Sequence, residues 1–155
     1  MDHLKAVQLE VHALVPTAAV AGATWGTSWA GLATSILLLP CWGLSSSRGT
    51  AMLVALAYYC GGAREMPTAL RAYYDLGYVE GGVLTVVCAG ALALPWAALW
   101  AVPTASRGSR AARAAAALVV STAPPLGLIG VCNPIAVSGT LLPGLGFVSV
   151  LGTLA

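Results

Sequence analysis

Charged residues leave long stretches of this chain empty, and this spacing limits what the chain can fold into. No Asp, Glu, Lys or Arg occurs between Glu10 and Arg48, between Arg48 and Arg64, between Glu80 and Arg107, or from Ala114 to the last residue. A helix that spans a bilayer needs about 20 mainly apolar residues. The gaps therefore predict a polytopic transmembrane helical bundle in which the charges mark the loops.

The composition supports the same interpretation. Of the 155 residues, 59% are hydrophobic and 8% are charged, whereas a soluble domain is about a quarter charged. This argues against a soluble globular enzyme. The net charge of +2 is small and the basic residues are scattered, so no nucleic-acid partner is expected, because that partner requires clustered Lys and Arg.

The first apolar stretch is long for one span and is interrupted by small residues between Trp25 and Trp29. Tryptophan favours the interface between membrane and water. We therefore predict a tight turn there, between a first span at residues 11–25 and a second at residues 28–44. A single tilted helix over residues 13–39 is the alternative.

The middle of the chain predicts two spans separated by an amphipathic segment. A third, short span is expected at residues 50–62. Residues 64–80 hold five of the twelve charged residues, and their pattern predicts either a helix in the plane of the membrane interface or a solvated loop. Residues 81–102 form the clearest span, which Pro95 is expected to kink.

The C-terminal part is expected to be more interrupted. A basic loop at residues 103–113 leads into an apolar helix at residues 111–130. The Pro-Pro pair at 124–125 must break or bend this helix, because proline lacks a backbone donor. A re-entrant turn and a truncated span are expected from Val131. The predicted fold is all-α, a single transmembrane domain over residues 1–155 with about five to six spans and one interfacial helix.

The distribution of basic residues favours a cytoplasmic N-terminus, because cytoplasmic loops are enriched in Lys and Arg. With six segments, five basic residues fall on the N-terminal side and two, Arg64 and Arg71, on the other. If the first two segments were one helix, Lys5 would join Arg64 and Arg71 against the remaining four. The charge bias thus also favours the early turn.

Small residues at Gly22, Gly26 and Ala30 are spaced four apart, a pattern that lets helices approach closely. The predicted turn crosses this pattern, so only Gly22 and Gly26 could share a helix face. Packing within the chain is therefore favoured over oligomerisation.

No grouping of side chains predicts a catalytic, cofactor-binding or metal-binding site. Both histidines, His3 and His12, lie in the N-terminal segment, which leaves no plausible nucleophile and base pair. No acidic residue falls in a predicted span, which weakens proton-coupled transport. The cysteines occur singly and are expected to fill space inside helices: Cys41, Cys60, Cys88 and Cys132.

Two polar residues near the apolar segments have an alternative interpretation. His12 is expected to be solvated or hydrogen-bonded, although it could titrate. Asn133, which precedes Pro134, is expected to cap a helix in a turn. The alternative is a polar group that lines a cavity at membrane depth.

Three stretches carry a resemblance to a known family: residues 53–67 (LVALAYYCGGAREMP), 93–100 (ALPWAALW) and 124–146 (PPLGLIGVCNPIAVSGTLLPGLG). Together they resemble the N-terminal membrane region of the TraB family of conjugal transfer proteins. That family is itself similar to apolipoprotein N-acyltransferases. The resemblance extends over most of the chain from about Trp25 onward.

The resemblance implies a membrane region joined to a periplasmic carbon-nitrogen hydrolase (nitrilase-like) domain, whose Glu, Lys and Cys carry acyl transfer. No residue here matches that triad, and Cys132 is not its nucleophile. The chain is therefore expected to be a fragment or a truncated relative without the catalytic domain. Six segments would leave Ala155 one span short of the periplasm.

Two hypotheses from different classes follow. The first is a membrane-anchoring region of a conjugal transfer protein in the bacterial inner membrane. It would be catalytically silent alone, with membrane lipid and other conjugation-system membrane proteins as partners. The second is a small self-contained multi-pass membrane protein, either a transporter subunit or a scaffold.

Overall fold

The computed structural model describes residues 2–100, 107–129 and 133, and every regular element in that part of the chain is helical. The all-α prediction is therefore confirmed there. In chain order the helices are α1 (Asp2–Ala23), α2 (Trp29–Thr34), the 3-10 helix η1 (Ser35–Leu37), α3 (Leu38–Leu44), α4 (Arg48–Gly62), α5 (Met66–Tyr74), α6 (Tyr78–Trp100), α7 (Arg107–Thr122) and α8 (Leu126–Ile129).

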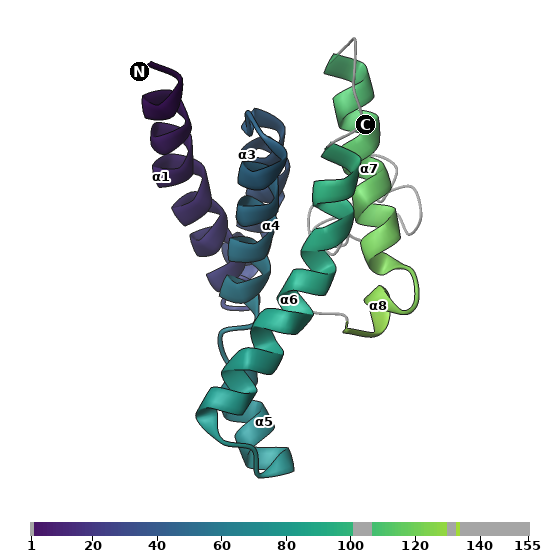
Figure 1. Cartoon of the computed structure of the whole chain (residues 1–155). Coiled ribbons are helices and arrows are strands. Elements are labelled where there is room, and N and C mark those ends of the chain that lie inside the picture. Colours follow the sequence, from purple (N-terminus) through teal and green to yellow (C-terminus); the bar gives the residue numbers. More distant parts are fainter. Residues whose placement is uncertain (1, 101–106, 130–132, 134–155) are drawn as a thin grey trace.

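The helices are arranged around α4 and α6. In Figure 1, α1, α3 and α4 stand side by side, α6 runs obliquely past them, and α7 lies along the far side of α6. The most extensive helix contact joins α1 to α4, and the next joins α4 to α6. The short α5 packs against the start of α6, at the opposite end of the molecule from the start of α7 (Figure 1).

The predicted tight turn after the first segment is confirmed, and the alternative single helix over residues 13–39 is wrong. Helix α1 ends at Ala23, and Gly26 adopts a φ of 76°, in the left-handed region that favours glycine. Ser28 then caps α2, because its hydroxyl oxygen accepts a hydrogen bond from the backbone N–H of Gly31 at 3.0 Å. The chain folds back, so that η1 and α3 pack against α1.

Glycine allows α1 and α4 to approach closely. A Cβ atom on Gly22 would overlap the carbonyl oxygen of Tyr58, and a Cβ atom on Gly61 would overlap the carbonyl oxygen of Ala19. Gly22 therefore packs within the chain, as predicted. Gly26 lies in the turn and not on a helix face beside Gly22, which corrects that part of the expectation.

Aromatic rings fill the junction of α3, α4 and α6. Trp42 and Trp96 meet edge to face with ring centroids 5.7 Å apart. The indole Nε1 of Trp42 donates to the carbonyl oxygen of Trp96 at 3.0 Å, and the indole Nε1 of Trp96 donates to the hydroxyl oxygen of Tyr59 at 3.1 Å. All three rings are buried, so the hydrogen bonds satisfy polar atoms that no solvent reaches.

Most of the described helices are too short or too polar to cross a membrane. Among the described residues, α6, with 23 residues, is the one helix long and apolar enough to cross a membrane. Helix α4 has 15 residues, and the apolar segment Ala30–Leu44 also falls below 18 residues. The expectation of about five to six spans is thus corrected for the described residues. The turn at Gly26 separates α1 from α2, and Ser28 and Ser47 cap the starts of the short helices α2 and α4.

The helix in the amphipathic segment at residues 64–80 covers only part of that segment. This helix, α5, has nine residues and is followed by α6 from Tyr78. Asp75 ends α5 in a left-handed conformation with a φ of 56°, which aspartate tolerates better than most residues. A helix is therefore confirmed at Met66–Tyr74, and its position in the plane of a membrane interface stays a prediction.

The basic residues after α6 were expected in a loop, and this is wrong. Arg107 is the first residue of α7, and Arg110 and Arg113 lie in its next turns. The expected break at residues 124–125 is present, since α7 ends at Thr122 before the short α8. The predicted re-entrant turn from Val131 lies outside the described residues.

Candidate functional site

Two hydrogen bonds connect α1, the α3–α4 region and α7 at one end of the helices. The backbone N–H of Ser46 donates to Oε2 of Glu10 at 3.0 Å, and Nη1 of Arg110 donates to the carbonyl oxygen of Gly43 at 2.7 Å. The first half of α1, the connection from α3 to α4 and the start of α7 therefore lie at the same end. This is the upper end in Figure 1.

Arginines at this end bind carbonyl groups at helix C-termini. Nη1 of Arg113 donates to the carbonyl oxygens of Leu99 and Trp100, at 3.0 and 3.3 Å, and Arg110 binds near the end of α3. The last carbonyls of a helix have no partner within it, and a cation there also complements the helix dipole. The arginines of α7 thus fix the ends of α3 and α6.

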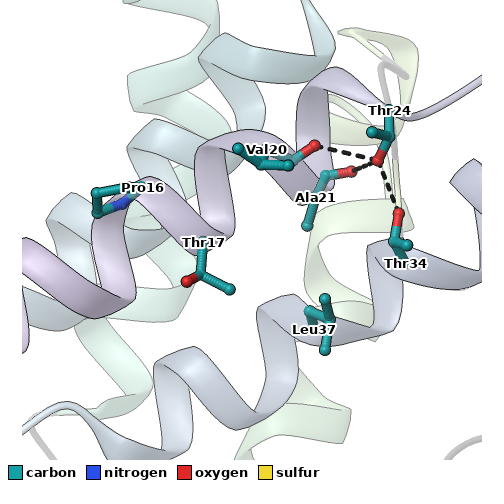
Figure 2. A pocket seen from close by; sticks show the side chains of 7 residues that line it. All are labelled: Pro16, Thr17, Val20, Ala21, Thr24, Thr34 and Leu37. Carbon is teal, nitrogen blue, oxygen red and sulfur yellow. Dashed lines mark hydrogen bonds between the residues drawn. The ribbon is translucent and has the colours of Figure 1, made fainter.

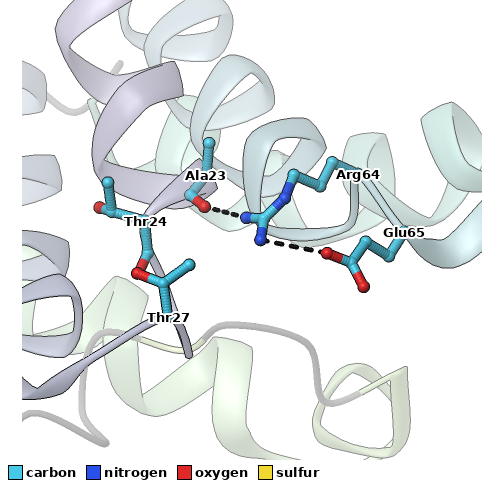
Figure 3. Close-up of polar contacts among 5 residues, drawn as sticks. All are labelled: Ala23, Thr24, Thr27, Arg64 and Glu65. Carbon is cyan, nitrogen blue, oxygen red and sulfur yellow. Dashed lines mark hydrogen bonds and ion pairs between the residues drawn. The ribbon is translucent and has the colours of Figure 1, made fainter.

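The opposite end has its own arginine contact. Arg64, in the connection between α4 and α5, donates through Nη1 to the carbonyl oxygen of Ala23, the last residue of α1 (Figure 3). Its Nη2 donates to Oε1 of Glu65 at 3.2 Å. The Arg64 side chain remains 39% exposed and that of Glu65 82% exposed, so both groups face outward at the α1–α2 turn.

The charges therefore divide unequally between the two ends. The end with the start of α7 carries five basic and two acidic residues, and the end with α5 carries two basic and three acidic residues. The six-segment prediction places the N-terminus, the segment before Arg48 and the basic residues after α6 at one end, and the turn after α1 and the segment with Arg64 at the other. The contacts of Glu10, Arg110 and Arg64 agree with this grouping. Which end faces the cytoplasm stays a prediction.

Exposed aromatic rings lie on α5 and beside it, and α5 buries none of its residues. Tyr73 and Tyr74 are highly exposed, as is Tyr78 at the start of α6. The guanidinium carbon of Arg71 lies 4.6 Å from the ring centroid of Tyr78, a cation–π contact. Tyrosine combines an apolar ring with a polar tip, which suits a boundary between membrane and water.

A groove of about 320 Å³ lies between α1 and the α2–η1 segment. Figure 2 shows its lining, in which Thr17 and Leu37 face one another across the opening. The lining residues are mostly small or aliphatic: Pro16, Thr17, Val20, Ala21, Thr24, Thr34 and Leu37.

The threonine hydroxyls of the groove are satisfied inside the protein. Thr17 donates to the carbonyl oxygen of Ala13 at 2.7 Å, and Thr34 donates to that of Gly31 at 2.7 Å. The hydroxyl oxygens of Thr24 and Thr34 lie 2.7 Å apart. These bonds leave mainly methyl groups to line the groove, so it suits an apolar occupant.

The residues singled out in the sequence are not brought together. His12 is exposed on α1 and is the one histidine whose side chain the structure describes. Cys41 is buried and Cys60 and Cys88 are half-buried, all without disulfides, on three different helices. Cys132 lies outside the described residues.

Asn133 contacts α7, and the segment after it, where a helix capped by Asn133 would begin, lies outside the described residues. Its Nδ2 donates to the hydroxyl oxygen of Ser121 at 3.0 Å, and Ser121 is buried on α7. The side chain therefore ties the chain beyond α8 to α7, a tertiary contact that sequence spacing did not predict.

Within the part of the chain that the structure describes, no three His, Cys, Asp or Glu side chains gather as metal ligands would. The groove and the arginine contacts are the features that sequence reasoning missed. Thr17 and Thr24 are seven residues apart and so share a helix face, which was the one local signal of a distinct surface there.

Comparisons with known proteins give two similar curated proteins. One is a probable conjugal transfer protein TraB of Sinorhizobium fredii (strain NBRC 101917 / NGR234), 29% identical over 134 residues, which cover 82% of this chain and 33% of that protein. The other is the conjugal transfer protein TraB of Agrobacterium fabrum (strain C58 / ATCC 33970), 26% identical over 137 residues, which cover 81% of this chain and 32% of that protein.

The chain thus spans about a third of the length of these curated relatives. No family model and no solved structure matches it. The relatives' names refer to conjugal transfer and not to acyl transfer.

Proposed function

We propose that this chain is a membrane-embedded helical region of a conjugal transfer protein, which anchors that protein in the bacterial inner membrane. The similarity to two TraB proteins supports the conjugal role. The observation that carries the membrane proposal is the arrangement of small and large apolar residues on α6.

Helix α6 turns several large aliphatic residues outward, whereas its buried face is made mainly of small residues together with Leu92 and Trp96. Ala89 and Ala93 are buried, whereas Val83, Val87 and Leu94 are about 60% exposed. A soluble protein would turn such a face to the core, because exposing large apolar side chains to water is unfavourable. Lipid removes that cost, and small residues then allow close packing between helices.

The ends of the molecule fit the same proposal. Helix α6 is about 34 Å long at 1.5 Å per residue, close to the roughly 30 Å of a bilayer's hydrocarbon core. The charged residues lie at its two ends, and the tyrosines around α5 would lie in the outer interface. The end with five basic residues would face the cytoplasm.

The shorter apolar helices are part of this proposal. Residues 28–44 and 50–62 would lie in the bilayer beside α6, in a multi-pass bundle that forms a single transmembrane domain. An acyltransferase-like domain, as in the family that the sequence resembles, would belong to the part of the relatives that this chain does not cover. The chain alone would then be catalytically silent, with membrane lipid and other conjugation-system membrane proteins as partners.

The alternative, a small transporter subunit, finds less support in the described residues. The polar side chains buried there are those of serine and threonine: Ser35, Ser45, Thr50, Thr85 and Ser121. Ion and substrate pathways typically place a charged group inside the membrane.

Alkaline extraction of bacterial membranes that contain the tagged chain tests the proposal. We expect the chain to stay in the membrane pellet and to be released by detergent. A double variant, Val83→Glu and Val87→Glu, places two charges on the outward face of α6 and should reduce the pelleted fraction severalfold, since a charge at the centre of a membrane helix costs about 3 kcal/mol of insertion and Val87 lies near the middle of α6.

A matched control changes residues at the exposed end of the molecule. Thr68 and Ala72 of α5 are both exposed, and their replacement by Glu should leave the pelleted fraction unchanged. Release of the parent chain by alkaline buffer would refute membrane embedding.

A further inference from the structure

We draw no further inference here: the strongest candidate, the outward apolar face of α6 around Val83, Val87 and Leu94, carries none, because nothing in the described part of the chain shows what covers it.

Discussion

The close contact between α1 and α4 predicts that the same glycine-to-alanine change lowers stability in α1 and raises it in α6. Gly22 lies against the backbone of Tyr58, so that a Cβ atom there would overlap a carbonyl oxygen of α4. Gly90 lies inside α6, and a Cβ atom there would have no neighbour within 4 Å. We compare Gly22→Ala with Gly90→Ala, which add the same methyl group to two helices.

The magnitudes follow from packing and helix propensity. Overpacking a tight contact costs about 1–3 kcal/mol, and the upper part of that range applies at Gly22 because a backbone atom cannot rotate away. Alanine in place of a helical glycine contributes at most about 1 kcal/mol. The free energy of unfolding should therefore fall by about 2 kcal/mol for Gly22→Ala and rise by about 0.5–1 kcal/mol for Gly90→Ala.

Reversible unfolding in mixed micelles, followed by tryptophan fluorescence, measures both free energies. The chain contains five tryptophans, and Trp42 and Trp96 at the buried junction should respond to loss of the fold. If Gly22→Ala is as stable as Gly90→Ala, the close approach of α1 and α4 does not exist and the argument is wrong.

Three further substitutions probe the polar contacts by the same unfolding measurement. Arg113→Gln should cost about 1–2 kcal/mol, because it removes charge-assisted hydrogen bonds to the end of α6, and equal stability would show that the contact contributes nothing. Tyr59→Phe keeps the ring but leaves the buried indole N–H of Trp96 without its acceptor, so a loss of about 1–3 kcal/mol is expected; no loss would contradict the hydrogen bond. Thr85→Val should change stability by less than about 0.5 kcal/mol, because the Thr85 hydroxyl donates to the carbonyl oxygen of Gly81 in its own helix and to no other group among the described residues, and a larger loss would indicate a partner on another helix.

The sequence was informative where local chemistry decides the structure. The tight turn before Trp29 could be predicted because Gly26 favours a turn conformation and Ser28 caps the start of the next helix, both by local rules. The break at residues 124–125 follows equally from the missing donors of proline. Helix α6 was recognised because it combines length with a continuous apolar composition.

Tertiary contacts and the ability of each segment to cross a membrane could not be read from the sequence. The charge gap before Arg48 predicted two spans, and the apolar segment Ala30–Leu44 matches the second of them in position but is shorter than a full membrane span. The arginines of α7 looked like loop residues because their partners, the carbonyl groups ending α3 and α6, are remote in sequence. The groove could not be predicted for the same reason, since its two walls come together only after the chain folds back at Gly26.

The orientation of the two ends across the membrane is the central claim, and reporter fusions after Ser46, Leu76 and Ser106 test it most directly. Alkaline phosphatase is active only in the periplasm, whereas green fluorescent protein exported there in unfolded form stays dark. We expect fluorescence after Ser46 and Ser106 and phosphatase activity after Leu76, because α4 and α6 would each cross the bilayer between those points. Reporters that show Leu76 and Ser46 on the same side of the membrane would contradict it.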